Sequence, residues 1–182
     1  MRSDFVDSYR DNFHYRDALA MASEIDIFTI MLGSNDSHRK EAYRLDPRFP
    51  DFYGQDEWKE SDDRIYVDDC KALMASLKDK NPNVRFVIGN CPATYENPTF
   101  PVAFFAGQWL RDLQASMIPE LNEEGFPTGF FDMFSVTKNL GDNYLDWYTA
   151  DGLHLNDTGY LNMAIAWKDS LAELIAEVKQ AE

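Results

Sequence analysis

The sequence has few cysteines and no long apolar run. Two cysteines, Cys70 and Cys91, occur in 182 residues; they could pair only if the fold brought their Cα atoms close, and we expect both thiols to be buried and free. No apolar stretch reaches the roughly 20 residues that span a bilayer, and residues 1–13 contain no apolar h-region. The sequence as written therefore predicts a soluble, cytoplasmic protein without a signal peptide. It does not determine the compartment, because a missing N-terminal segment could carry a signal for secretion.

Basic residues are also scarce. The chain has 17 Lys and Arg against 32 Asp and Glu, which gives a net charge of -15. Phosphate binding needs a basic face, so this charge disfavours nucleic acid and anionic membranes as partners. It is compatible with a neutral or cationic small molecule. The chain of 182 residues is long enough to form a single domain, 1–182, and 45% of its residues are hydrophobic, which is enough for a sizeable core.

Apolar periodicity predicts helices that alternate with strands. Residues 12–22 favour a helix in which Phe13, Ala18 and Met21 share a face, and residues 25–31 favour a strand buried on both faces because its apolar residues barely alternate. The remaining predictions are helices at 62–79, at 101–122 (kinked or broken by Pro119) and from Asn156 or Asp157, strands at 84–88 and 129–134, and loops at 37–61 and 136–152. The buried stripe expected along the helix at 62–79 is Tyr66, Cys70, Leu73, Met74 and Leu77; that of the last helix is Tyr160, Ala164, Trp167, Leu171, Leu174 and Val178. This order indicates an α/β domain with a parallel sheet, whose sites lie at the carboxyl ends of the strands.

Two polar stretches could carry chemistry. Gly33-Ser34-Asn35-Asp36 directly follows the strand at 25–31. Gly33 permits a sharp exit, and the amide of Asn35 offers two uncharged N–H donors that suit an oxyanion hole. The alternative is an ordinary turn, because Gly, Ser, Asn and Asp are common turn residues.

The second stretch is Asp151-Gly-Leu-His154, directly before the last helix. This spacing lets the Asp151 carboxylate reach one imidazole nitrogen of His154, which leaves the other nitrogen as a general base. The alternative is an Asp-Gly turn followed by an exposed histidine.

Together these stretches resemble the SGNH hydrolase family, also called GDSL-type esterases. IDIFTIMLGSNDS is similar to the family's block that contains the oxyanion asparagine, DGLHLNDTGYLNMA is similar to its last block, and KALMASLKDKNPNVRFVIGNCPATY is similar to the helix and strand between them. The resemblance implies a flavodoxin-like three-layer α/β/α fold and ester hydrolysis, often of acetyl groups on carbohydrates, without a metal or organic cofactor. It assigns Asn35 as an oxyanion donor, His154 as the general base and Asp151 as its orienting partner. It leaves Gly33 to shape the turn, Ser34 as filler and Asp36 to brace the loop.

The family's first block, a strand that ends in Gly-Asp-Ser with the nucleophilic serine, has no counterpart here. The nearest strings are RSD at Ser3 and VDS at Ser8, and neither follows a convincing strand. We therefore expect little or no esterase activity from this chain alone; the alternative is a non-catalytic α/β binding module that kept the pocket. We also expect the first two strands of the family fold to be missing, either through a reading frame truncated at an internal Met or in a naturally short paralogue. The strand at 25–31 would then be an exposed edge and could form a homodimer.

Aromatic residues could wall a substrate pocket. Trp147 and Tyr148 precede Asp151, with Tyr144 close by, and Tyr43, Phe49, Phe52, Tyr53 and Trp58 lie in the loop at 37–61. They either stack on a sugar ring or pack the loops onto the domain. A neutral small-molecule or carbohydrate ester suits the acidic chain better than a phosphate ester. A metal-dependent phosphoesterase is a further alternative, but with three histidines, His14, His38 and His154, it would lack ligands.

Overall fold

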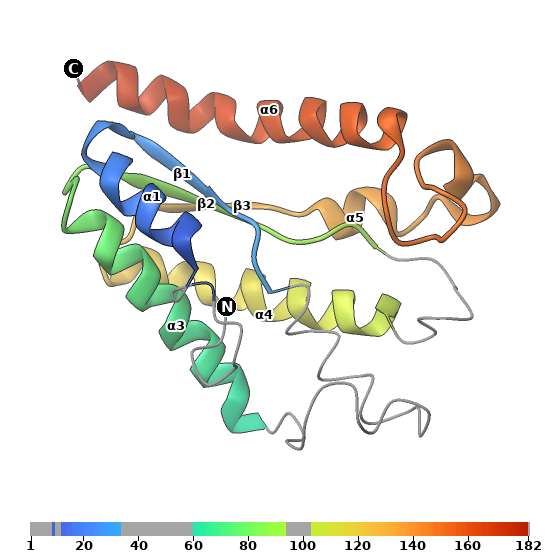
Figure 1. Cartoon of the computed structure of the whole chain (residues 1–182), viewed down its shortest axis with the longest axis horizontal. Coiled ribbons are helices and arrows are strands. Elements are labelled where there is room, and N and C mark those ends of the chain that lie inside the picture. The colour runs from blue at the N-terminus through green and yellow to red at the C-terminus, as the bar shows by residue number, and fades with distance from the viewer. Residues whose placement is uncertain (1–8, 10–11, 34–59, 94–102, 182) are drawn as a thin grey trace.

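The computed structural model describes residue 9 and residues 12–33, 60–93 and 103–181. They form three layers, in which a parallel sheet lies between one long helix on one side and a group of helices on the other (Figure 1). In chain order the elements are α1 (Phe13–Met21), η2 (Ala22–Glu24), β1 (Ile27–Ile30), α3 (Glu60–Lys78), β2 (Arg85–Gly89), α4 (Ala103–Glu123), β3 (Thr128–Phe131), α5 (Met133–Thr137), η3 (Gly141–Asp146) and α6 (Asp157–Ala181). The predicted α/β class with a flavodoxin-like three-layer arrangement is correct.

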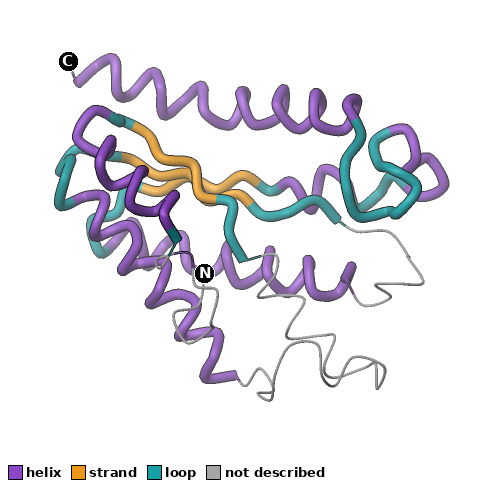
Figure 2. The backbone as a smooth tube through the Cα atoms, in the orientation of Figure 1, coloured by secondary structure: helices purple, strands orange, loops and turns teal. Residues whose placement is uncertain are grey.

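The described sheet has three strands in the order β1-β2-β3, and both pairs are parallel. Ile30 pairs with Ile88, which in turn pairs with Phe130. Because the strands are parallel and in register, their carboxyl ends meet at the same edge of the sheet (Figure 2). The segments after β1, β2 and β3 therefore leave the sheet together, which is where a parallel sheet places its site.

Helix α3 presents one continuous apolar stripe to the sheet. Its five predicted core residues are all at most 3% exposed: Tyr66, Cys70, Leu73, Met74 and Leu77. They pack against Val84, Phe86 and Ile88 in one cluster. Full burial of one such side chain contributes roughly 1.5–3 kcal/mol, so this stripe holds α3 on the sheet, as its periodicity predicts.

Helix α1 buries Tyr15 in place of two of its three predicted core residues. Phe13 and Met21 are each 59% exposed, whereas Ala18 is partly buried and Tyr15 is buried. The Tyr15 hydroxyl donates a hydrogen bond to Oγ of Ser76 at 2.8 Å and so attaches α1 to α3. Tyr15 can bury its apolar ring and still form a hydrogen bond through its hydroxyl. A pattern of purely apolar residues does not reveal this.

Strand β1 is shorter than the predicted span 25–31, and it is not buried on both faces. Ile30 is buried but Thr29 is exposed. Within the described sheet, β1 pairs with β2 alone and so forms one edge. Helix α6 packs over the face of the sheet opposite α3, where Ile27 of β1 belongs to the same apolar cluster. Its Trp167 ring lies over Gly89 of β2, where an added Cβ would lie 2.9 Å from the indole.

The predicted strand at 129–134 ends early. Strand β3 stops at Phe131, and Asp132 then caps α5 by accepting a hydrogen bond from the backbone N–H of Ser135. The capping carboxylate begins a helix inside an apolar run that favours a strand by composition. Part of the predicted loop at 136–152 is consequently helical, in α5 and η3.

The two long remaining helices also differ in detail from their predictions. Helix α4 continues past Pro119 without a break. In α6, Trp167 and Leu171 of the predicted stripe pack toward the sheet, together with Met163 and Ala166, whereas Tyr160 is 52% exposed and Ala164 is also exposed. The side chains of Leu174 and Val178 lie outside the described part of the structure. The predicted stripe is therefore correct at Trp167 and Leu171 and wrong at Tyr160 and Ala164. No helix among the described residues has the length and apolarity required to cross a membrane.

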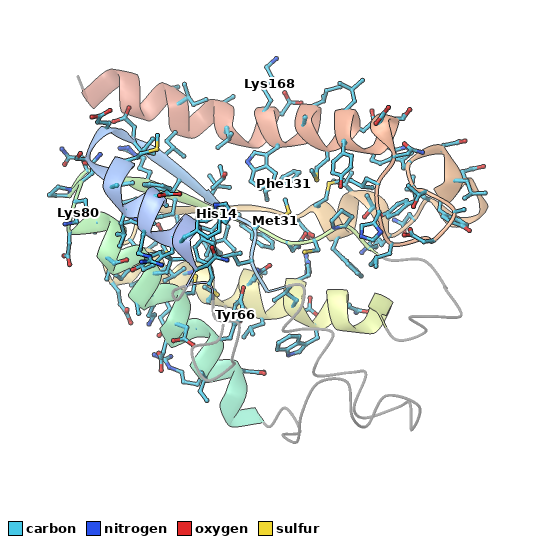
Figure 3. The ribbon with its side chains drawn as sticks, in the orientation of Figure 1. His14, Met31, Tyr66, Lys80, Phe131 and Lys168 are labelled. Carbon is cyan, nitrogen blue, oxygen red and sulfur yellow. The ribbon has the colours of Figure 1, made fainter. Side chains whose placement is uncertain are left out.

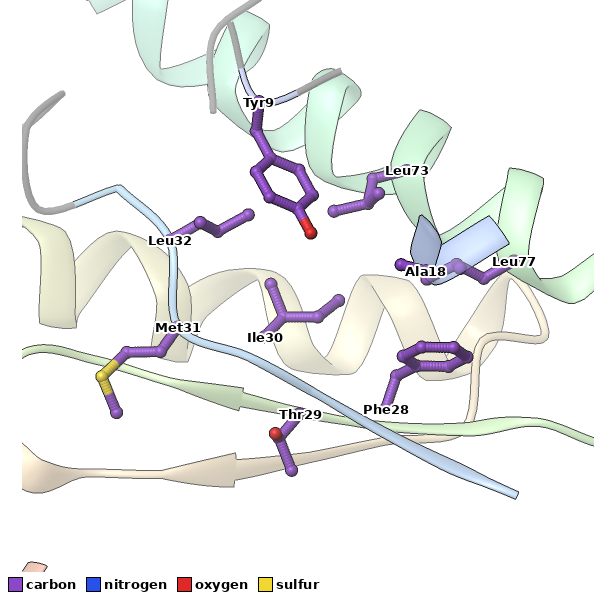
Figure 4. A pocket seen from close by; sticks show the side chains of 9 residues that line it. All are labelled: Tyr9, Ala18, Phe28, Thr29, Ile30, Met31, Leu32, Leu73 and Leu77. Atoms are coloured by element: carbon purple, nitrogen blue, oxygen red, sulfur yellow. The ribbon is translucent and has the colours of Figure 1, made fainter. Parts of the chain in front are cut away.

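A small cavity of about 140 Å³ lies beside β1, on the face of the sheet that α3 covers (Figure 4). Its walls are Tyr9, Ala18, Phe28, Thr29, Ile30, Met31, Leu32, Leu73 and Leu77. No carboxylate, imidazole or thiol side chain is among them, so this cavity lacks groups for hydrolysis. The chemistry has to be sought at the carboxyl edge of the sheet.

Candidate active site

The segment before α6 folds back on itself as a short hairpin. Tyr148 and Leu155 form an isolated antiparallel bridge. The backbone N–H of Thr149 donates to the carbonyl of His154 at 2.8 Å, and that of Asn156 donates to the carbonyl of Trp147 at 2.8 Å. Figure 1 shows this segment in orange beyond α5, at the edge of the sheet where the strands end. The hairpin therefore carries the predicted pair, Asp151 and His154, in its turn.

Asp151 is surrounded by donors within that turn. Its Oδ1 atom accepts from the hydroxyl of Thr149 at 2.6 Å and from the backbone N–H groups of Leu153 and His154 at 2.9 Å each. Its Oδ2 atom lies 2.6 Å from Nδ1 of His154. The His154 contact, followed by the Thr149 and backbone hydrogen bonds, lowers the pKa of Asp151 well below its usual range. Asp151 is therefore an ionised carboxylate that can only accept hydrogen bonds.

His154 has one ring nitrogen engaged. Because the Asp151 carboxylate is ionised, Nδ1 must carry the proton in their contact, which leaves Nε2 of a neutral ring as an acceptor. The His154 side chain is 68% exposed, against 42% for Asp151. The ring is therefore held by its inner nitrogen and open to solvent elsewhere, which is the arrangement that a general base requires.

Gly33 ends the segment that leaves β1. Its φ is +113°, and a Cβ there would lie 2.8 Å from both Cε2 and the hydroxyl oxygen of Tyr66. The carbonyl of Leu32, one residue earlier, accepts from the Tyr66 hydroxyl at 2.9 Å and from Nε2 of Gln114 at 3.2 Å. Figure 3 labels Tyr66 on the face of the sheet that α3 and α4 cover. Sequence reasoning missed Tyr66 and Gln114 as supports of this turn, because nothing local signals a bond to so distant a carbonyl.

Ser34, Asn35 and Asp36 lie outside the described residues, as do His38 and the aromatic residues of the loop at 37–61 up to Trp58. The oxyanion role of Asn35 and the bracing role of Asp36 therefore stay predictions. What the structure describes is the exit that leads to them, the turn at Gly33 on the carboxyl side of β1.

The two predicted pocket residues occupy different environments. Tyr148 is 2% exposed, and its hydroxyl donates to the carbonyl of Ala93, in the segment that follows β2. Trp147 is partly buried and packs with the cluster around Phe131. Tyr148 thus links the hairpin to the segment after β2, while Trp147 keeps some of its surface open. Substrate contact by either ring stays a prediction.

A further polar group joins the ends of β2 and β3. Asn90, which is 1% exposed, donates to Oδ1 of Asp132 at 2.9 Å and accepts from the backbone N–H of Phe134 at 2.7 Å. Nε of Arg111 donates to the other Asp132 oxygen at 2.8 Å. Burial raises the pKa of Asp132, but the hydrogen bonds from Asn90, Ser135 and Arg111 outweigh it and hold this pKa below its usual value. Asn90, Asp132 and Arg111 therefore hold the ends of β2 and β3 together at this edge of the sheet. In the sequence, Asn90 after the strand at 84–88 indicates a polar group there, but it does not identify Asp132 and Arg111 as its partners.

Among the described residues, no three His, Cys, Asp or Glu side chains are arranged to hold a metal ion. His14 lies on α1, where its ring packs against Phe13 at a centroid distance of 3.8 Å. Neither Cys70 nor Cys91 forms a disulfide; Cys70 is buried as expected, whereas Cys91 is partly exposed. The candidate catalytic side chains among the described residues are those of Asp151 and His154.

Comparisons with known proteins define the class. The sequence model of the GDSL-like Lipase/Acylhydrolase family matches residues 3–161. The chain belongs to this family of ester hydrolases. A comparison with curated proteins returned no match.

Six chains of solved structures match. One is a peptidoglycan O-acetylesterase, with a TM-score of 0.55 and 18% sequence identity over 88% of this chain. This likeness shows a shared fold. The match covers 41% of that protein's chain, so the present chain spans less than half of its length.

Proposed function

We propose that this chain forms the base-bearing part of a hydrolase that removes acetyl or other short acyl groups from carbohydrate or small esters. The observation that carries the proposal is the 2.6 Å contact between Nδ1 of His154 and Oδ2 of Asp151. Three further donors hold the same carboxylate in place. In a hydrolase of this family, the pair would remove the proton from a serine hydroxyl. Membership of the family supports this role for His154 and Asp151.

In the proposed reaction, Nε2 of His154 takes the proton of the attacking hydroxyl as its oxygen bonds to the ester carbonyl carbon. Asp151 keeps the ring in the Nδ1-protonated tautomer and stabilises the imidazolium that forms. The amide of Asn35 would donate to the carbonyl oxygen as negative charge develops on it, a contact worth roughly 2.7–4 kcal/mol for an oxyanion-hole donor in serine hydrolases of other folds. His154 then returns the proton to the leaving alcohol, and water repeats the sequence to release the acid.

The nucleophile is the part that this sequence does not supply in recognisable form. No Gly-Asp-Ser string occurs among the 182 residues, so we expect the chain by itself to hydrolyse esters poorly. A non-catalytic binding module is the second candidate, and the same missing string favours it. Such a module would bind a short acyl ester or its carbohydrate without turnover.

Hydrolysis of p-nitrophenyl acetate separates these candidates. We expect little turnover by the 182-residue chain, and ready turnover by the product of any reading frame extended upstream to include a Gly-Asp-Ser. In the active form, His154→Ala should lower kcat by roughly 10⁴- to 10⁶-fold. His14→Ala is the matched control, because it removes an imidazole from α1 and should leave the rate unchanged.

Two results would change the proposal. Turnover by the 182-residue chain that His154→Ala abolishes would mean that a serine within this chain acts as nucleophile. An extended frame without a serine after its first strand, combined with binding of acetylated sugars, would favour the binding module. Rates on p-nitrophenyl phosphate, which we expect to be negligible, test the phosphoesterase alternative.

A further inference from the structure

Asn156 joins three segments of the chain at the base of the hairpin. Its Nδ2 group donates to the carbonyl of Tyr148 at 3.1 Å and to that of Leu145 at 3.2 Å. Its Oδ1 atom accepts from the backbone N–H of Gly159 at 2.9 Å, which caps α6. One side-chain amide therefore connects the end of η3, the first arm of the hairpin and the first turn of the long helix.

The chemistry of these contacts requires an asparagine. Two donors and one acceptor on a short side chain are used at once, and no other residue of this length supplies both. An aspartate would retain the helix cap but would set a carboxylate against the carbonyls of Leu145 and Tyr148. A serine would also cap the helix but would lose the two donors. Both replacements therefore keep the N-cap of α6 but remove the hydrogen bonds to Leu145 and Tyr148, so they test those bonds without the cap.

The helix also approaches the hairpin very closely at this point. A Cβ on Gly159 would lie 2.1 Å from the carbonyl oxygen of Trp147, which is itself the acceptor for the backbone N–H of Asn156. Both arms of the hairpin therefore contact the first turn of α6. We infer that this contact determines the orientation of the turn that contains Asp151 and His154.

We propose that Asn156 is the positioning residue that sets the direction in which His154 faces the site, through its donation to the carbonyls of Leu145 and Tyr148. The hydrogen bonds inside the turn join Asp151 to His154, but both side chains are exposed, and the turn keeps one geometry only while the two arms of the hairpin are held together at its base. Asn156 holds the arms there and links them to η3 and α6, in addition to the bond from Tyr148 to the segment after β2. It acts through His154. The proposal extends the proposed function, since an oriented His154 matters for activity only if His154 is the base.

Nuclear magnetic resonance of the His154 ring tests this without requiring turnover. In the native chain we expect a slowly exchanging Nδ1 proton and a ring held in the Nδ1-protonated tautomer. Asn156→Asp and Asn156→Ser should each broaden or abolish the Nδ1 proton signal and shift the ring toward a mixture of tautomers. In an active form, the same variants should lower kcat by up to about 100-fold with little change in KM, as displacement of a catalytic group by about 1 Å does.

Asn122→Asp is the matched control. Asn122 makes the same three kinds of contact far from the hairpin, since its Nδ2 donates to the carbonyls of Ile118 and Thr128 and its Oδ1 accepts from the backbone N–H of Thr128. Its replacement should lower the melting temperature as the Asn156 variants do, but leave the His154 signals unchanged. A loss of stability alone would therefore not reproduce the predicted signature.

The proposal is overturned if folded Asn156→Ser and Asn156→Asp proteins keep the native Nδ1 proton signal and tautomer. If neither variant folds, hydrogen exchange in the native chain decides: both Asn156 amide protons should exchange slowly, and exchange at the rate of a free amide would overturn the proposal. The proposed function could fail separately. If the His154 signals change in the Asn156 variants but the protein has no esterase activity, the positioning role stands and the proposed function does not.

Discussion

Asp151 and His154 lie three positions apart in the sequence, and Oδ2 of the carboxylate is 2.6 Å from Nδ1 of the imidazole. The contact forms within one turn, and the same turn supplies two backbone N–H groups to the other carboxylate oxygen. A pair of this kind depends little on distant packing. Its direction relative to the sheet is a separate matter, which the contacts of the hairpin with α6 and with the segment after β2 decide.

Replacing Gly33 by alanine should destabilise the domain. Its φ of +113° disfavours any side chain, and the added Cβ would lie 2.8 Å from the ring of Tyr66, which is 1% exposed and cannot move away. Gly125→Ala is the control, since its φ is +83° but its nearest neighbour is the mobile Lys78 amine at 3.7 Å. Urea unfolding should show Gly33→Ala losing at least about 1 kcal/mol more than Gly125→Ala. Equal losses would mean that the Tyr66 contact is unimportant.

Asp151 should make stability depend on pH in the acid range. Because its folded-state pKa lies below the unfolded value of about 3.9, the carboxylate stabilises the fold above about pH 4 and loses this effect as the pH falls toward the folded pKa. In Asp151→Asn, the free energy of unfolding should therefore vary less with pH below about pH 4. Urea unfolding from pH 2.5 to 7 measures it. Asp146→Asn, at an exposed carboxylate of the same segment, should keep the native profile; a native profile in Asp151→Asn would contradict the prediction.

The two thiols should differ sharply in reactivity. Burial raises the pKa of Cys70 to about 12, so only about 10⁻⁴ of it is thiolate at pH 8. Cys91 is partly exposed. With Ellman's reagent we expect Cys91 to react first and Cys70 to react only on unfolding. Cys91→Ser should remove the fast phase, and a fast phase that persists in this variant would show that Cys70 is accessible.

We propose that two copies of the chain associate through the edge of β1. Within the described sheet β1 pairs on one side alone, and its exposed residue, Thr29, is uncharged. Such an edge favours pairing with another strand. Light scattering after size exclusion should give twice the 21.0 kDa chain mass, and Thr29→Lys should shift the protein toward the monomer. Val136→Lys, at an exposed apolar position on α5, should not; a well-folded monomeric native chain would refute the proposal.

The candidate site divides according to the range of its interactions. Asp151, His154 and the cap at Asn156 could be predicted because they are joined by contacts within the same short segment. The burial of Tyr148 could not, because the carbonyl that accepts its hydrogen bond belongs to Ala93, 55 positions away. The group formed by Asn90, Asp132 and Arg111 was missed for the same reason, since three separate elements supply it.

The sequence by itself determined the elements whose apolar periodicity is strong and whose caps are local: the stripe of α3, the alternation of strands with helices, and the turn that pairs Asp151 with His154. Tertiary structure alone decided which face of α1 is buried and how α6 lies over the sheet. In both cases the deciding contact is made with a distant segment, Tyr15 with Ser76 and Trp167 with Gly89. Local propensity contributes a few tenths of a kcal/mol per residue, whereas such long-range packing contributes roughly 1.5–3 kcal/mol per buried side chain, so packing prevails where the two disagree.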